Sequence, residues 1–233
     1  MGQIYLANAA FKAAGYDLGA TVKAAAREGF AGVQLYVNEI DQDDLPAMRR
    51  LADVARAAHD ASLGVIVHLP RVVTEAIAEA TRVLLRFESS PRAIAHYEPG
   101  RPVPEIEGVQ VGLENAIQGL DPQYYEQLIA EWNARATFLA FDPPRLFGRR
   151  RVDLASAYSF AEQMLDELRP DDVLHLIDQR RPGGRRADWC VLGRGLLAPL
   201  LPRLAAHPGL IVLEFETLGQ SVASKAVLEA PLA

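Results

Sequence analysis

The chain has 233 residues, half of which are apolar, and its formal net charge is −6. This length suits one α/β domain with a large core, and no low-complexity linker divides it, so we expect a single domain over residues 1–233. The acidic balance argues against a nonspecific hold on nucleic acid, and no run of about 18 apolar residues predicts a membrane span. The single cysteine, Cys190, argues against a disulfide framework and a Cys-based zinc site, and it fits a cytoplasmic location.

Strand-like and helix-like segments alternate along the chain. Short apolar runs predict strands at residues 4–7, 32–37, 64–68, 93–96, 109–116, 137–142, 173–178 and 210–216. Apolar residues at helical spacing predict helices at residues 21–28, 45–63, 75–87, 122–133, 154–168, 196–206 and 221–228, three of them with the N-caps Asp44, Thr74 and Asp153. Eight strands alternating with helices predict a (β/α)8 barrel. A doubly wound open sheet is the alternative, but N-A-A-F-K-A-A-G after the first strand is not the Gly-rich phosphate turn that it needs.

The connection between the fourth and fifth strands is too short for an outer helix. Residues 98–108 read E-P-G-R-P-V-P-E-I-E-G, and their prolines disfavour a packed crossover helix. We therefore expect the helix between strands 4 and 5 to be shortened or missing. Its absence should leave apolar strand surface uncovered, so we expect a homodimer that buries this side of the barrel.

Polar side chains end the apolar runs of successive strands. Glu114, Asp142, His175 and Glu214 belong to the fifth to eighth strands, and each points into the barrel if the apolar residue two positions earlier does. In a (β/α)8 barrel this end carries the active site. Three carboxylates and an imidazole can converge on one divalent ion, and the mixed ligation suits Mn, Mg, Co, Fe or Zn without selecting among them. Glu216 is the alternate eighth-strand ligand. For any one of these residues, the other reading is a strand-end side chain bonded to loop amides.

Six segments carry a family resemblance through their order and spacing. They read G-F-A-G-V-Q-L-Y, G-V-I-V-H-L-P, V-G-L-E-N-A, V-L-H-L-I-D, L-G-R-G-L-L and I-V-L-E-F-E. Together they resemble the xylose isomerase-like TIM-barrel superfamily over nearly the whole chain. That superfamily contains sugar isomerases and epimerases, hydroxypyruvate isomerase, inosose dehydratase and endonuclease IV. The resemblance implies a metal held by Glu114, Asp142, His175 and Glu214.

Several positions depart from the superfamily's pattern. Members commonly carry Asp-x-x-His after the sixth strand, whereas this chain reads D-P-P-R and ends at Arg145, whose guanidinium cannot ligate a metal. Gln34 stands where the second strand frequently carries Glu. His68 and His96 match the early zinc histidines of endonuclease IV, but A-D-W at residues 187–189 replaces its Asp-x-His, so a three-zinc phosphodiesterase site is incomplete.

The candidate substrate-binding residues are His68, His96, Arg145, Gln34, Asn115 and Arg180. His68 could hold a substrate hydroxyl or a second metal, or it could be a hydrogen-bonded strand-end side chain, and His96 is a weaker candidate of the same kind. Arg145 could neutralise a carboxylate or phosphate on the substrate. Arg180 begins a basic, Gly-containing run that could close over an anionic substrate, although such charge runs are usually solvated.

The expected function is that of a metal-dependent isomerase or epimerase acting on a small hydroxy-carbonyl compound, such as a sugar, sugar acid or sugar phosphate. One divalent ion would chelate adjacent carbonyl and hydroxyl oxygens and stabilise an enediolate. Glu114 and Glu214 would take and return the carbon-bound proton. The alternatives are a metal-dependent phosphodiesterase resembling AP endonucleases and a non-catalytic binding barrel. The expected partner is a small molecule, with Arg145 favouring an anionic one, and neither nucleic acid nor membrane is expected.

Overall fold

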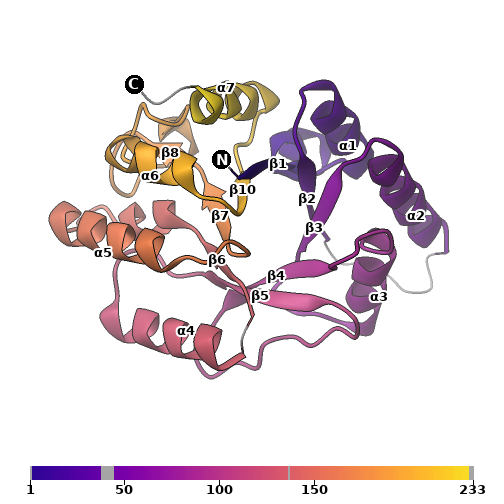
Figure 1. Ribbon diagram of the computed structural model, residues 1–233, viewed down its shortest axis with the longest axis horizontal. Coiled ribbons are helices and arrows are strands. Elements are labelled where there is room, and N and C mark those ends of the chain that lie inside the picture. Colours follow the sequence, from indigo (N-terminus) through magenta and orange to yellow (C-terminus); the bar gives the residue numbers. More distant parts are fainter. Residues whose placement is uncertain (1, 38–44, 136, 231–233) are drawn as a thin grey trace.

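Eight parallel strands close into a barrel at the centre of the computed structural model, which describes residues 2–37, 45–135 and 137–230 (Figure 1). Around the barrel they follow the order β1-β10-β7-β6-β5-β4-β3-β2. The bounds are β1 (Gln3–Ala7), β2 (Gly32–Tyr36), β3 (Gly64–His68), β4 (Arg92–Tyr97), β5 (Gln110–Asn115), β6 (Leu139–Phe141), β7 (Val173–Leu176) and β10 (Leu210–Leu213). The predicted (β/α)8 barrel is therefore confirmed.

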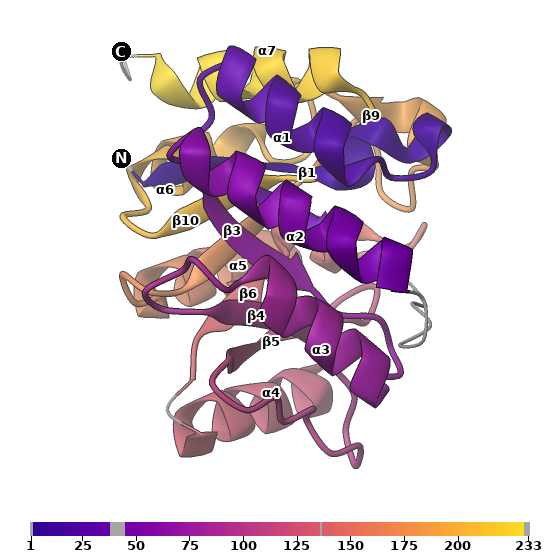
Figure 2. The ribbon, with the colours of Figure 1, turned by 90° about the vertical axis from the view of Figure 1, so that its right-hand side faces the viewer.

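Helices surround the barrel, and Figure 2 shows the first three side by side on one flank. Their bounds are α1 (Leu18–Arg27), α2 (Leu45–Asp60), α3 (Glu75–Leu84), α4 (Pro122–Arg135), α5 (Leu154–Glu167), α6 (Leu201–Ala206) and α7 (Leu218–Glu229). The predicted N-caps Thr74 and Asp153 are confirmed, because each side chain accepts a hydrogen bond from a first-turn amide, whereas Asp44 lies outside the described residues. Within the described ranges, none of the helices has the length and apolar character that crossing a membrane requires.

Short elements change the predicted boundaries near the last strands. The predicted strand 173–178 stops at Leu176, because β8 (Asp178–Gln179) turns away to pair antiparallel with β9 (Trp189–Cys190). The predicted helix 196–206 begins as the 3-10 turn η4 (Ala198–Leu200) before α6 starts. Further 3-10 turns are η1 (Asn8–Ala14), η2 (Pro143–Phe147) and η3 (Arg186–Asp188).

Alternate residues of the strands point inward and fill the barrel. This inner cluster consists of Tyr5, Ala7, Ile66, Ile94, Phe138, Ala140, Val173, Leu210 and Val212. Glycines make room for its rings, since a Cβ at Gly112 would lie 2.3 Å from the ring of Phe138 and one at Gly64 would lie 1.9 Å from the hydroxyl of Tyr5. The side chains of the inner cluster thus fill the interior of the barrel. The next inward-facing positions lie at the carboxyl ends of the strands.

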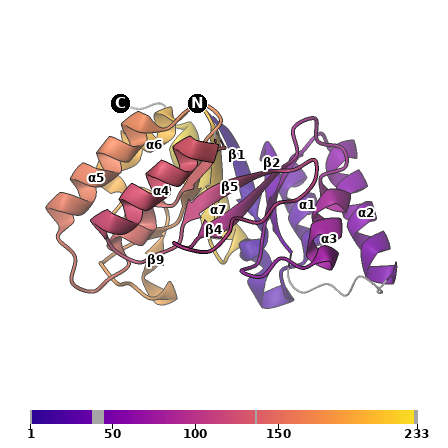
Figure 3. The same cartoon turned by 90° about the horizontal axis from the view of Figure 1, so that it is seen from below.

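Residues 98–109 connect β4 directly to β5 as turns and extended chain, without a helix in this fully described segment. Figure 3 shows α3 and α4 on either side of the two strands. Part of the apolar surface here is covered, since Ile106 is 5% exposed and Tyr97 is 8% exposed, and Val103 packs against the core. Val109 and Val111 stay half-buried beside a hollow of about 280 Å³. The homodimer stays a prediction, which light scattering at micromolar concentration can test.

Candidate metal centre and active site

The four polar residues predicted from the strand ends all lie at one end of the barrel, because they continue its inward alternation. Glu114 comes two residues after Gly112, and Asp142, His175 and Glu214 come two residues after the inner-cluster residues Ala140, Val173 and Val212. His68 ends β3, and His96 on β4 lies directly opposite Glu114 on β5. The alternation of inward- and outward-facing residues along the strands therefore brings these side chains together.

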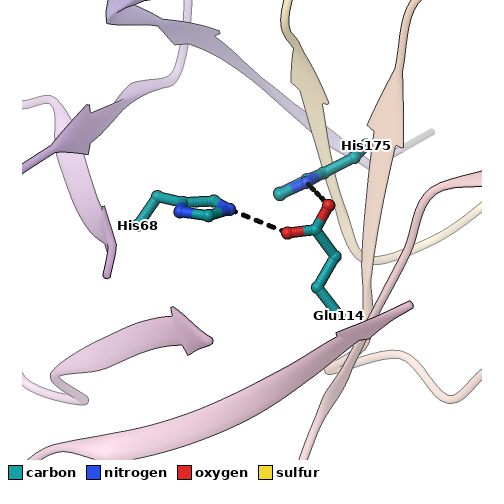
Figure 4. A group of neighbouring side chains, drawn as sticks. All are labelled: His68, Glu114 and His175. Atoms are coloured by element: carbon teal, nitrogen blue, oxygen red, sulfur yellow. Dashed lines mark hydrogen bonds and ion pairs between the residues drawn. The ribbon is translucent and has the colours of Figure 1, made fainter. Parts of the chain in front are cut away.

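Three buried side chains form the group best suited to a metal: His68, Glu114 and His175. One ligand atom from each lies within 4.8 Å of the other two, and this is the one such group among the described residues. In Figure 4 both imidazoles face the carboxylate of Glu114. His68 Nε2 lies 2.7 Å from Glu114 Oε2, and His175 Nδ1 lies 3.5 Å from Glu114 Oε1. Ligand atoms about 2.1 Å from one ion would be separated by roughly 3.0–3.5 Å, so the His175 contact matches that spacing, whereas the His68 contact is shorter and would have to lengthen by a few tenths of an ångström.

The hydrogen bonding of His68 gives a first test of that fit. Its Nδ1 lies 3.2 Å from the carbonyl oxygen of Leu69, which can only accept, so Nδ1 carries the proton. Its Nε2 then faces Glu114 Oε2 at 2.7 Å, which is a direct hydrogen bond without room for an ion between the two atoms, so both side chains would have to move slightly apart to share a metal. A histidine that donates one N–H to a backbone carbonyl and turns the other nitrogen inward is the usual arrangement of a metal ligand.

His175 gives a second test. Its side chain is fully buried, and neither ring nitrogen meets hydrogen-bond geometry with a described residue, although Nδ1 lies 3.5 Å from the Oε1 atoms of both Glu114 and Glu214. Burial alone lowers its pKa, but the carboxylates of Glu214 and Glu114 raise the pKa to about 9. Unpartnered buried nitrogens are costly, and a metal ion would satisfy one of them. The residues present therefore fit a divalent ion.

Glu114 is surrounded by cationic and imidazole groups. Besides the two histidines of the group, it meets His96 Nε2 at 3.2 Å and Arg145 Nη2 at 2.9 Å. Burial would raise the pKa of Glu114, but the charges of Arg145 and His175 hold the pKa well below its usual value. Glu114 is thus an anion that no solvent reaches.

Asp142 and Glu214, which were predicted as ligands, have other partners in this structure. Asp142 Oδ2 forms an ion pair with Arg145 Nε at 2.7 Å. Burial is the largest influence on Asp142 and raises its pKa to about 7, despite the charge of Arg145. Glu214 Oε1 accepts a hydrogen bond of 2.5 Å from Gln34 Nε2 and lies 3.5 Å from His175 Nδ1. Both carboxylates border the His68–Glu114–His175 group without belonging to it.

Of the remaining candidate residues, some lie next to the His68–Glu114–His175 group and others lie away from it. Glu216, the alternate ligand, forms an ion pair with Lys12 at 2.7 Å, so the structure brings Glu214 to the site instead. Asn115 is buried, and its Oδ1 accepts a hydrogen bond of 2.7 Å from the backbone nitrogen of Asp142. Arg180 is exposed on the loop after β8. Asn115 therefore positions Asp142, and Arg180 lies apart from the group.

A cavity of about 390 Å³ opens beside the centre. Its lining consists of Gln118, Asp142, Pro144, Arg145, Gly148, Ile177, Gln179, Gly184, Trp189 and Glu214. The sequence prediction missed Gln118, Gln179 and Trp189, which lie on loops and in the β8–β9 pair, where no periodic pattern marks them. It also missed Tyr36, whose ring stacks on His68 with a centroid separation of 4.6 Å. Its inward position two residues after Gln34 could have identified it.

The fold and the site define a (β/α)8 barrel with a His/Glu/His group that could bind a metal at the carboxyl ends of its strands. No family model matches the chain, and no curated protein matches it either. Among solved structures, a xylose isomerase-like TIM barrel protein from Mycobacterium smegmatis, in complex with magnesium, is similar with a TM-score of 0.64 and 14% identity, over 98% of this chain and 96% of that one.

Two further structures have the same fold. The probable 3-DHS dehydratase involved in petrobactin synthesis from Bacillus anthracis has a TM-score of 0.64 and 13% identity, over 97% of each chain. A sugar phosphate isomerase/epimerase from Parabacteroides distasonis has a TM-score of 0.57 and 14% identity, over 99% of this chain and 97% of that one. The chain thus has the fold of the xylose isomerase-like TIM barrels, as its motifs predicted.

Proposed function

We propose that the protein is a metal-dependent isomerase or epimerase of a small hydroxy-carbonyl compound, such as a sugar or sugar acid. The observation that carries the proposal is the buried His68–Glu114–His175 group next to a cavity lined by two further carboxylates. The similar sugar phosphate isomerase/epimerase and the magnesium complex support it, because they place sugar chemistry and a metal on the same fold.

In this proposal His68, Glu114 and His175 hold one divalent ion. The bound ion would supply positive charge beside the substrate carbonyl, which favours loss of a proton from the adjacent carbon. Glu114 has two tasks in the sequence prediction, as ligand and as proton carrier. Its complete burial and its four close partners favour the task of ligand.

Proton transfer needs a carboxylate that reaches the substrate. Glu214 lines the cavity and keeps 18% of its side chain exposed, so it is the better placed base. It would take the proton from the carbon next to the carbonyl. Asp142 lines the same cavity and could return a proton to the neighbouring carbon, which gives isomerisation, or to the other face, which gives epimerisation.

The cavity also limits the substrate. A volume of about 390 Å³ suits a small molecule. Gln118 and Gln179 offer amide groups to hydroxyls, while Ile177 and Trp189 form an apolar wall. The buried Oε1 of Gln34, which has no hydrogen-bond partner among the described residues, is a further acceptor at the centre. These groups favour a polyhydroxylated substrate of sugar size.

Metal binding is the first test. Protein purified without chelators should contain one equivalent of a divalent metal, and added Mn²⁺ or Co²⁺ should raise the melting temperature of metal-depleted protein by mass action. Glu114→Gln should reduce that rise. Glu216→Gln is the matched control, since Glu216 pairs with Lys12. Two or three bound ions would instead support a phosphodiesterase, and the absence of any metal-induced shift would refute the metal centre.

Catalysis is the second test. A panel of ketoses, aldoses and sugar acids in deuterated water should include a compound whose carbon-bound hydrogen exchanges in the presence of the protein. Glu214→Gln should abolish that exchange while it leaves the metal-induced rise in melting temperature largely intact. Exchange that persists in this variant would exclude Glu214 as the base.

A further inference from the structure

Arg145 already supplies a cation to the candidate centre. Its Nη2 lies 2.9 Å from Glu114 Oε1 and its Nε lies 2.7 Å from Asp142 Oδ2, so one guanidinium bridges two buried carboxylates. A third edge, Nη1, donates to the carbonyl oxygen of Ala116 at 3.2 Å, and Nη2 lies 3.4 Å from His96 Nε2. Each of the three guanidinium nitrogens therefore has a contact within the protein, while the side chain keeps 20% exposure and lines the cavity.

The backbone holds Arg145 in this place. It lies in the 3-10 turn η2, which follows β6 and begins with two prolines. Its carbonyl oxygen accepts hydrogen bonds from the amides of Gly119 at 2.7 Å and Gly148 at 3.1 Å, and its own amide donates to Asp142. This short, doubly anchored turn fixes the backbone from which the side chain extends, and the contacts with Glu114 and Asp142 hold the guanidinium itself.

Glu114 is the residue that this arginine shares with the candidate metal group. One of its oxygens, Oε1, faces both Arg145 and His175, while the other faces His68. An ion held by His68, Glu114 and His175 would thus lie within a few ångströms of a fixed positive charge. Two cations at such a separation repel strongly in a buried site, where water screens little.

We propose that Arg145 is a built-in cation that opposes the metal ion, so the centre binds a divalent ion more weakly with Arg145 than with a neutral side chain. This inference rests on the metal site of the proposed function. It adds a role to the substrate contact expected for Arg145 from the sequence, which stays a prediction, since the side chain keeps 20% exposure and lines the cavity.

The experiment is calorimetric titration of metal-depleted protein with Mn²⁺. Arg145→Gln and Arg145→Met remove the charge and keep much of the length, and either should bind Mn²⁺ at least tenfold more tightly than the natural protein, which equals about 1.4 kcal/mol. Arg145→Lys keeps the charge and should stay within a few-fold of the natural affinity. Arg203→Gln is the control for net charge, because Arg203 pairs with Asp166 on the outer helices.

A second readout is the melting temperature without metal. Arg145→Gln leaves two buried carboxylates without their counter-ion, so the metal-depleted variant should melt below the natural protein. Mn²⁺ should then raise its melting temperature more than it raises that of the natural protein. If both neutral variants fail to fold even with millimolar Mn²⁺, the inference is overturned, because Arg145 would then be needed beside an ion rather than in opposition to it.

The outcomes separate this inference from the proposed function. Mn²⁺ binding that is equal in the natural protein and the neutral variants, or weaker in the variants, overturns the inference and leaves the metal-dependent function standing. Binding only by the neutral variants supports the inference and refutes metal dependence of the natural protein. Binding by none of them refutes both.

Discussion

Gln34 on β2 and Glu214 beyond β10 are joined across the mouth of the barrel by a hydrogen bond of 2.5 Å from Nε2 to Oε1. The two strands are separated in the barrel by β1, so the bond fixes the carboxylate from a distant part of the chain. The amide that donates this bond is neutral, so it holds the carboxylate of Glu214 in place without neutralising its negative charge. A glutamate at position 34 would instead place a second carboxylate against it.

Gln34→Leu tests what this bond does for Glu214. The variant keeps the size of the side chain but removes the donor, and a hydrogen bond to a charged group contributes roughly 1.5–3 kcal/mol. We expect the rate of hydrogen exchange in the responsive substrate to fall about ten- to hundredfold. Gln163→Leu is the matched control, since Gln163 also donates to a glutamate, Glu167, but on the exposed face of α5. Equal rates in the two variants would show that Gln34 does not position Glu214.

The part of the site that follows strand parity could be predicted from sequence. Glu114 and His175 are inward-facing because they continue the alternation of Gly112 and Val173, and the period of two is visible in the printed sequence. The same rule identifies His68. The membership of the metal group was harder to predict, because it depends on which side chains reach across the barrel.

The contacts of Arg145 could not be predicted from the sequence. Its position after the sixth strand marked it as unusual, but its contacts with Glu114 and Asp142 arise from the 3-10 turn that carries it. Trp189 reaches the cavity through a two-residue antiparallel pairing, which is too short for a periodic signal. The burial of Ile106, on the connection between the fourth and fifth strands, likewise depends on tertiary packing.

Packing inside the barrel gives a stability prediction at Gly112. A Cβ there would lie 2.3 Å from the ring of Phe138, which is fully buried. Gly112→Ala should therefore destabilise the protein by about 1–3 kcal/mol, measured as the free energy of unfolding in urea. Phe138→Leu in the same chain should recover part of the loss. Gly219→Ala on α7 is the control, since its Cβ would meet open space, and it should be neutral or slightly stabilising.

Asp178 organises the loop that carries Trp189. Its buried carboxylate accepts hydrogen bonds from the backbone amides of Gln179, Gly193, Gly195 and Leu197 at 2.8–3.1 Å. Asp178→Asn turns an amide group toward some of these donors, so we expect a loss of roughly 2–4 kcal/mol and faster amide hydrogen exchange over residues 190–197. Asp188→Asn changes a surface carboxylate of the same loop and should cost less. Unchanged exchange in Asp178→Asn would contradict an organising role.

His207 makes a pH-dependent contribution to stability. It lies between α6 and β10, is 5% exposed, and its Nε2 lies 3.0 Å from the carbonyl oxygen of Asp172. Burial lowers its pKa below the value of the unfolded chain, although the contact with Asp172 opposes that shift. The folded state therefore binds this proton less readily than the unfolded state. The contribution of His207 is fully present above the unfolded pKa and is lost as the pH falls through the folded pKa.

The measurement compares urea unfolding of the natural protein and His207→Gln at pH 7.5 and pH 5. Gln cannot gain a proton, while its amide can still donate to the Asp172 carbonyl. We expect the natural protein to lose more free energy of unfolding than the variant between the two pH values. Other groups that titrate in this interval, such as the neighbouring Asp172 with its raised pKa, are present in both proteins, so the difference isolates His207. Identical losses would show that His207 does not contribute to acid sensitivity.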